Sequence, residues 1–100
     1  MIKNSEIAMV NAASYALEYQ DKNPGADVEE IIKRVIQNLD SLRTEKNIKV
    51  FGIAAASEIL KVKKENKHKT NKQILQMFIN NSKSFLERLN DERLYGANTS

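Results

Sequence analysis

The chain has 100 residues, of which 41% are hydrophobic and 29% charged, and its formal net charge is +3 at pH 7. This length suits one domain with a modest hydrophobic core, and the composition is that of a globular protein. The absence of cysteine excludes disulfides, thiolate metal sites and a cysteine nucleophile. No apolar run approaches the roughly 20 residues that span a bilayer, and no long apolar region follows Lys3 as in a signal peptide. We therefore expect no membrane partner and a cytoplasmic location.

Apolar residues recur with helical spacing along most of the chain, and glycine and proline are rare. The first helix is predicted from residue 4 or 5 to residue 21, with Ile7, Val10, Ala13, Ala16 and Leu17 as its apolar stripe. The stretch KNPGA, residues 22–26, ends it, because proline disfavours helical geometry in the preceding residue. The second helix begins after Asp27, an N-cap residue with Glu30 three positions on, as in a capping box. The apolar stripe of this second helix ends near residues 43–47.

The third helix is predicted over residues 47–66. It is apolar over more than half of its circumference, so we expect it to be the most buried helix. IKVFGI, residues 48–53, alternates like a short strand but has no partner strand, so we prefer the helical interpretation. The fourth helix opens at Thr70, whose capping box is completed by Gln73, and is predicted to end before Gly96.

A shift of 43 residues aligns residues 10–43 with residues 53–86 without a gap, and nine of the 34 positions are identical. Two amphipathic hairpins could align by accident, but helical periodicity alone does not produce shared polar positions such as Asn38/Asn81. We therefore predict an all-α fold of two tandem helical hairpins, closed into a four-helix unit with pseudo-two-fold symmetry. The predicted boundaries are a single domain over 1–95, repeat 1 over about 5–43, repeat 2 over about 48–90 and a flexible tail at 96–100.

Small residues occupy the same place in both copies, Ala12 and Ala13 in the first and Ala55 and Ala56 in the second. Side chains this small allow two helices to approach closely. We expect the first and third helices to cross at these alanines in the centre of the fold. A homodimer would complete the core if one chain leaves apolar surface uncovered.

The two copies differ in the charge of their central turn. KVKKENKHKTNKQ, residues 61–73, carries +5, whereas the aligned residues 18–30 carry −4. Positive charge beside the N-terminus of a helix favours anions, so we predict a site for a polyanion such as nucleic acid, or for an acidic protein. The stretch lacks arginine and aromatic residues, so contacts to nucleic acid would be independent of sequence. The predicted site residues are Lys61, Lys63, Lys64, Lys67, His68, Lys69 and Lys72.

Two other interpretations of this charge remain open. The lysines can serve only to keep the protein in solution, or the acidic and basic turns of different subunits can attract each other. The short connections at 43–47 and 66–70 would also suit a helix-turn-helix, but the expected turn glycine is missing.

No pattern in the sequence indicates catalysis. His68 is the only histidine, and without a second histidine or a cysteine to join it we expect no metal site and no cofactor. No serine and carboxylate stand in a pattern that would make a catalytic set with His68, so we interpret it as a loop residue. Tyr15 and Tyr19, one helical turn apart, could stack a partner, although an edge of the core suits them better. Met77 and Phe78 are ascribed to the core or a dimer interface. The sequence thus favours a non-enzymatic binding or regulatory module, and the alternative is a protein that assembles through its helices.

Overall fold

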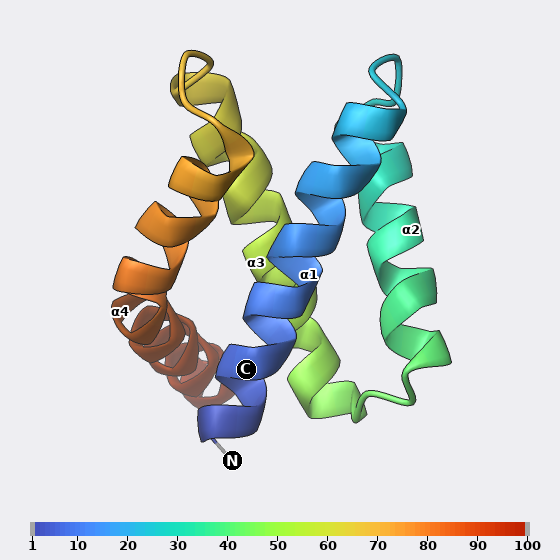
Figure 1. Ribbon diagram of the computed structural model, residues 1–100. Helices are drawn as coiled ribbons and strands as arrows, with labels where there is room; N and C mark the ends of the chain where they lie inside the picture. Colours follow the sequence, from blue (N-terminus) through green and yellow to red (C-terminus); the bar gives the residue numbers. More distant parts are fainter. Residues whose placement is uncertain (1, 100) are drawn as a thin grey trace.

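The computed structural model describes the backbone of residues 2–99 and the side chains of residues 5–89. Four α-helices and no strands make up this part of the chain, which confirms the predicted all-α class (Figure 1). Residues 48–53 are helical, which agrees with the predicted helix and not with the alternative of a short strand. The helices are α1 (Ile2–Lys22), α2 (Val28–Ser41), α3 (Lys46–Glu65) and α4 (Asn71–Thr99).

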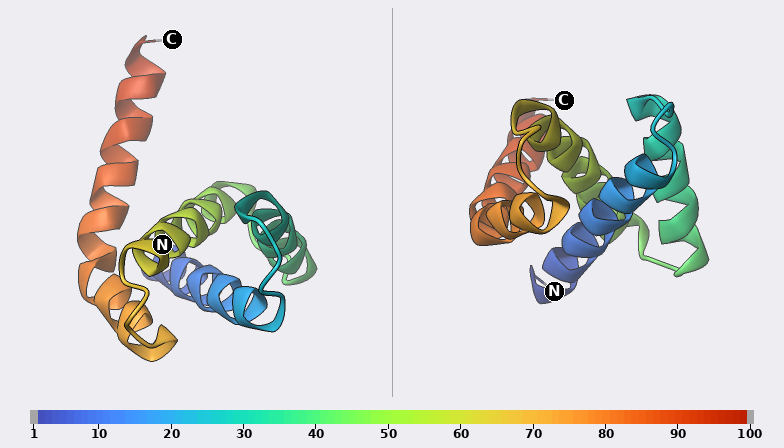
Figure 2. Two further views of the ribbon diagram at one scale, coloured as in Figure 1. Left: turned by 90° about the horizontal axis from the view of Figure 1, so that it is seen from above. Right: turned by 45° about the horizontal axis from the view of Figure 1, so that its top comes forward.

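Helices α1 and α3 cross in the middle of the molecule, and α2 and α4 lie on opposite flanks (Figures 1 and 2). The largest helix–helix contact is that between α1 and α3, and across the described residues α2 and α4 do not touch each other. The first and third helices therefore lie together at the centre, as expected. The third is not more buried than the first, so the expectation that it would be the most buried helix is not met.

The centre of the core is built from small residues, which lets α1 and α3 approach closely. Gly52 of α3 marks a tight point, because a Cβ atom added there would lie 3.0 Å from Leu39 Cδ1 and 3.5 Å from Ala12 Cβ. Larger side chains surround this centre and seal it. The largest fully buried ones are Met9, Ile31, Ile59, Ile74 and Val35.

The buried face of α1 is rotated from the predicted stripe. Ala13, Ala16 and Leu17 are buried as predicted, but Ile7 is 51% exposed, and Ala8, Met9 and Ala12 are buried in addition. This helix packs against α3 through its alanines and touches both α2 and α4 as well. Three neighbours give α1 a broader buried face than the single stripe that periodicity reveals.

Both predicted N-caps are present. Glu30 N donates to Asp27 Oδ1 at 2.9 Å. At α4 the capping box is complete, since Gln73 N donates to Thr70 Oγ1 at 3.1 Å and Thr70 N donates to Gln73 Oε1 at 2.9 Å. At α2 the box is only half made, because the Glu30 carboxylate accepts instead from the Tyr19 hydroxyl at 2.7 Å.

The connection from α2 to α3 is closed by a Schellman-type turn. Thr44 N donates to Leu39 O at 3.1 Å, and Arg43 N donates to Asp40 O at 3.0 Å. This turn needs a left-handed residue, and Arg43 supplies it with φ of 57°. Arginine there carries the steric strain that glycine would avoid.

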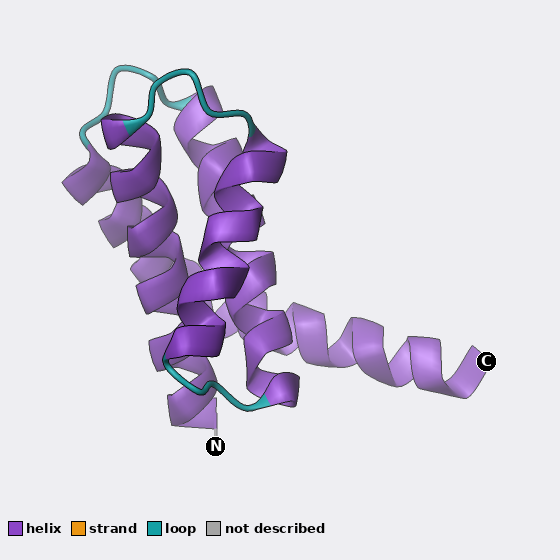
Figure 3. Cartoon of the chain, turned by 90° about the vertical axis from the view of Figure 1, so that its right-hand side faces the viewer, coloured by secondary structure: helices purple, strands orange, loops and turns teal. Residues whose placement is uncertain are grey.

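Helix α4 runs through Gly96 to Thr99, so the predicted end before Gly96 is wrong. A single glycine weakens a helix by about 1 kcal/mol but keeps its backbone hydrogen bonds. The last part of α4 extends away from the other three helices (Figures 2 and 3). Within the described part of the chain, none of the four helices contains a segment with the length and hydropathy that a bilayer crossing requires.

Candidate functional site

The seven predicted site residues, named here the basic corner, lie where α3 ends and α4 begins. Lys61, Lys64, Lys67, His68 and Lys72 are exposed, whereas Lys63 and Lys69 are half-buried. The turn between the helices is held by Asn66, whose Nδ2 donates to Val62 O at 2.8 Å and whose carbonyl accepts from Lys69 N at 3.0 Å. This frame presents the exposed lysines to solvent at one end of the molecule.

The acidic α1–α2 turn lies at the same end of the molecule as the basic corner (Figure 1). Asp21 of α1 connects the two: its carboxylate lies 3.8 Å from Lys63 Nζ and also accepts a hydrogen bond from Asn71 Nδ2. Lys63 Nζ in turn donates to Asn71 Oδ1. Of the predicted site residues, Lys63 is therefore already held by an acidic partner within the chain, which the sequence did not indicate.

A hollow of about 480 Å³ lies between the first hairpin and the basic corner, and Asp21 and Lys63 are among its lining residues. One wall comes from the first hairpin and the other from α3 and the basic corner. Gln20 contributes a polar group whose Oε1 atom is buried and has no hydrogen-bond partner. The lining residues are Gln20, Asp21, Pro24, Val28, Leu60, Lys63, Lys64 and Lys67.

The exposed lysines of the basic corner form no ion pair with the side chains that the structure describes. Among the side chains of residues 5–89, the ion pairs are Lys49–Asp40 and Lys63–Asp21. Lys61, Lys64, Lys67 and Lys72 thus keep their charge available to a partner.

The four predicted helix-packing alanines lie in the core. Ala12 is 3% exposed, and Ala13, Ala55 and Ala56 are fully buried. They belong to the contacts within one chain, and their burial leaves no surface there for a second chain to bind.

Tyr15 and Tyr19 lie at the edge of the core. Their rings are nearly parallel with centroids 6.4 Å apart, and the Arg34 guanidinium lies 5.8 Å from the Tyr19 ring centroid. The hydrogen bond to Glu30 raises the pKa of Tyr19 above its ordinary value of 10.0. Both rings are thus occupied by contacts within the first hairpin.

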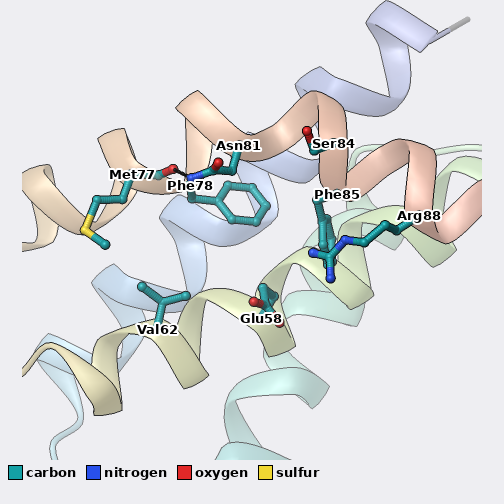
Figure 4. A pocket seen from close by; sticks show the side chains of 8 residues that line it. All are labelled: Glu58, Val62, Met77, Phe78, Asn81, Ser84, Phe85 and Arg88. Carbon is teal, nitrogen blue, oxygen red and sulfur yellow. Dashed lines mark hydrogen bonds between the residues drawn. The ribbon is translucent and has the colours of Figure 1, made fainter.

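A second hollow, which sequence reasoning missed, lies between α3 and α4 (Figure 4). Its volume is about 300 Å³. Phe78 and Phe85 meet edge to face on one side, with ring centroids 5.7 Å apart. Four apolar and four polar side chains surround it: Val62, Met77, Phe78, Phe85, Glu58, Asn81, Ser84 and Arg88.

Across the described part of the chain, no three histidine, aspartate or glutamate side chains are grouped so that they could hold a metal ion. Comparisons with protein-family models, curated proteins and solved structures found no match for this chain. What the protein does must therefore be inferred from these surfaces.

Proposed function

We propose that the protein is a non-enzymatic binding module whose basic corner contacts a polyanion, with nucleic acid phosphate as the first candidate. The observation that supports this is the set of exposed lysines, Lys61, Lys64, Lys67 and Lys72, which make no ion pair within the described side chains. Lys67 precedes α4 and Lys72 lies in its first turn, where the helix dipole also favours negative charge, whereas Lys61 and Lys64 lie in the last turns of α3. The proposed location is the cytoplasm.

The neighbouring charges limit the type of contact. Asp21 and the acidic α1–α2 turn would repel a polyanion that extended across the whole end of the molecule. Lysine is a flexible point charge without the rigid planar fork of arginine, so a patch of lysines alone favours contacts to phosphate over the reading of bases. We therefore expect a short, sequence-independent contact with the outer side of the corner. An acidic polypeptide satisfies the same charges and is the other partner to test.

Charge reversal with a matched control tests this proposal. In one variant Lys64, Lys67 and Lys72 are replaced by Glu, and in the control three exposed lysines elsewhere, Lys33, Lys46 and Lys83, are replaced in the same way. Each triple change lowers the net charge from +3 to −3, so both variants have the same net charge. Affinity for a labelled DNA duplex, and separately for polyglutamate, is measured by fluorescence anisotropy.

We expect the Lys64/Lys67/Lys72 variant to lose binding and the control variant to keep most of it. Equal loss in both variants would mean that only net charge matters, and no binding of either polyanion by the unaltered protein would remove the proposal. Circular dichroism confirms that the variants remain folded.

Assembly through the helices is the second candidate, and one surface favours it. Ile7 of α1 and Ile79 of α4 are 51% and 39% exposed. Both line a hollow of about 370 Å³ between these helices, together with Glu6, Val10, Asn11 and Ser82. If this surface joins two copies, Ile79→Glu should convert a dimer into a monomer in sedimentation velocity. The lysine variants should leave that dimer intact.

We also propose that the chain arose as two copies of one hairpin, and the hydrogen bonds of the turns support this. Asn23 Nδ2 donates to Tyr19 O, just as Asn66 Nδ2 donates to Val62 O. Ala26 N donates to Asn23 O at 2.9 Å, matching the bond from Lys69 N to Asn66 O. Two turns of opposite charge thus share one hydrogen-bond frame at a shift of 43 residues.

Burial supports the same equivalence. At a shift of 43 residues, nine pairs of positions are buried in both copies and fall on the central and flanking helices alike. The pairs are Ala8/Phe51, Met9/Gly52, Ala12/Ala55, Ala13/Ala56, Ala16/Ile59, Leu17/Leu60, Ile31/Ile74, Val35/Phe78 and Leu39/Ser82. A closed unit with pseudo-two-fold symmetry accounts for this correspondence.

A further inference from the structure

The hollow between α3 and α4 has a counterpart between α1 and α2. The counterpart is lined by Tyr15, Val35, Asn38 and Leu42, among others, and 43 residues later these positions are Glu58, Phe78, Asn81 and Phe85 of the α3–α4 hollow. The two spaces occupy equivalent places in the hairpins, yet their volumes are about 10 Å³ and about 300 Å³. The second hairpin therefore contains an open site where the first is closed.

The difference follows from two positions on the central helices. In the first hairpin the rings of Tyr15 and Tyr19 stack at this place, with Arg34 over Tyr19. In the second hairpin the aligned residues are Glu58 and Val62, neither of which carries a ring. The second hairpin thus lacks a side-chain volume of about one tyrosine at this place, while the other aligned lining positions remain occupied.

The lining of the open site suits an aromatic ring with a polar substituent. Phe78 and Phe85 present ring surfaces, and the Arg88 guanidinium lies 5.4 Å from the Phe85 ring centroid. Met77 and Val62 face the space from the other end (Figure 4). Aromatic rings pack favourably against other rings and against thioethers.

Glu58 provides the hydrogen-bond acceptor. Its side chain points toward the hollow from α3 (Figure 4), and it makes no hydrogen bond or ion pair with the described side chains. The first hairpin contains a hydrogen bond of the same kind, although not at the aligned position, since the Tyr19 hydroxyl donates to the Glu30 carboxylate at 2.7 Å. A hydrogen bond to a charged acceptor is stronger than one between neutral groups.

We propose that the α3–α4 hollow binds one phenol-type aromatic ring, whose hydroxyl donates to Glu58. The ring can belong to a free monocyclic phenol or to a tyrosine side chain, which share this chemistry. The inference rests on the hairpin equivalence proposed above. It does not depend on the basic corner, because none of the corner residues lines this hollow.

Titration with p-cresol, the side-chain analogue of tyrosine, tests the site. We expect saturable shifts in amide NMR spectra, centred on Glu58, Val62, Met77 and Phe85, with a Kd on the order of 1 mM for so small a ligand. The matched control ligand is 4-methylcyclohexanol, which has a similar shape but no aromatic ring and should bind several-fold more weakly. Absence of saturable shifts, or equal binding of both ligands, would overturn the proposal.

Two variants test the space for the ring and the hydrogen bond to Glu58 separately. Val62→Tyr restores the residue of the first hairpin, and we expect it to fill the hollow and abolish p-cresol binding without loss of the basic corner. Glu58→Leu removes the acceptor. It should lower the affinity for p-cresol by about tenfold and leave the affinity for toluene unchanged. The assigned geometry is wrong if Val62→Tyr binds p-cresol as well as the unaltered protein does. It is also wrong if Glu58→Leu lowers the affinities for p-cresol and toluene equally.

A third arm distinguishes the source of the ring. N-acetyl-tyrosinamide carries the same phenol on a peptide backbone. Binding at least as tight as that of p-cresol supports a tyrosine side chain of a partner, and binding of p-cresol alone supports a free phenol. Failure of this site would leave DNA binding by the basic corner unaffected, so the two proposals can fail separately.

Discussion

The contact between Gly52 of α3 and Leu39 of α2 allows the proposed equivalence of the hairpins to be tested quantitatively. Leu39 is buried, and its Cδ1 atom lies only 3.0 Å from where a Cβ of residue 52 would be. The equivalent positions in the other half are Met9 and Ser82, both buried. In one contact the flanking helix supplies a large residue, Leu39, and the central helix supplies glycine. In the other contact the central helix supplies the large residue, Met9, and the flanking helix supplies the small Ser82.

We predict that Gly52→Met and Leu39→Ser each destabilise the protein but that the double variant recovers much of the loss. Gly52→Met overpacks the contact at a cost of about 1–3 kcal/mol, partly offset by the higher helix propensity of methionine. Leu39→Ser opens a cavity at a cost of about 2–5 kcal/mol. In the double variant the methionine enters the space that Leu39 vacates. We expect a favourable coupling free energy of at least about 1 kcal/mol.

Urea unfolding followed by far-ultraviolet circular dichroism measures these free energies. Gly25→Met is the matched control, because a Cβ at Gly25 would have nothing within 4 Å. Gly25→Met should change the free energy of unfolding little. Combined with Leu39→Ser, its effect should be additive, with no coupling free energy. If the Gly52→Met and Leu39→Ser changes are also additive, the packing exchange between the two hairpins is refuted.

Three further predictions concern local interactions. Arg43→Gly should raise the free energy of unfolding by about 0.5–1 kcal/mol, since it relieves the left-handed strain at this turn; a lower urea midpoint would contradict this. Thr70→Ala should cost about 1 kcal/mol in the same assay, because it removes the α4 cap, and unchanged stability would argue against the cap. The raised pKa of Tyr19 means that its contribution to stability is complete below pH 10.0 and is lost as the pH rises through the folded-state pKa. Phenolate absorbance should show Tyr19 titrating at lower pH in Glu30→Gln, and an unchanged titration would rule out the hydrogen bond to Glu30 as the cause.

Local patterns were enough to predict the four helices and the N-caps of α2 and α4. Asp27 and Thr70 cap their helices through bonds between residues three positions apart, and such bonds depend little on the rest of the fold. The segment 48–53 is helical, as the lack of a partner strand in the sequence predicts. Periodicity and turn chemistry carry this information directly.

Tertiary contacts decided what the sequence did not predict. The rotated face of α1 arises because three helices pack on it, and the contact of Asp21 with Lys63 depends on how the two hairpins meet. The α3–α4 hollow left a signal in the sequence, since the repeat alignment pairs Tyr15 with Glu58 and Tyr19 with Val62. The loss of two rings at aligned positions indicates missing volume, provided that the two hairpins share one frame.

The salt dependence of duplex DNA binding tests the central functional proposal most directly. If the four exposed lysines of the basic corner each neutralise one phosphate, log K should fall against log salt concentration with a slope of about −3.6. Affinity would then drop roughly 100-fold between about 50 and 200 mM salt. Binding that is absent at the lowest salt, or a slope that the Lys64/Lys67/Lys72 variant leaves unchanged, would contradict a polyanion site at this corner.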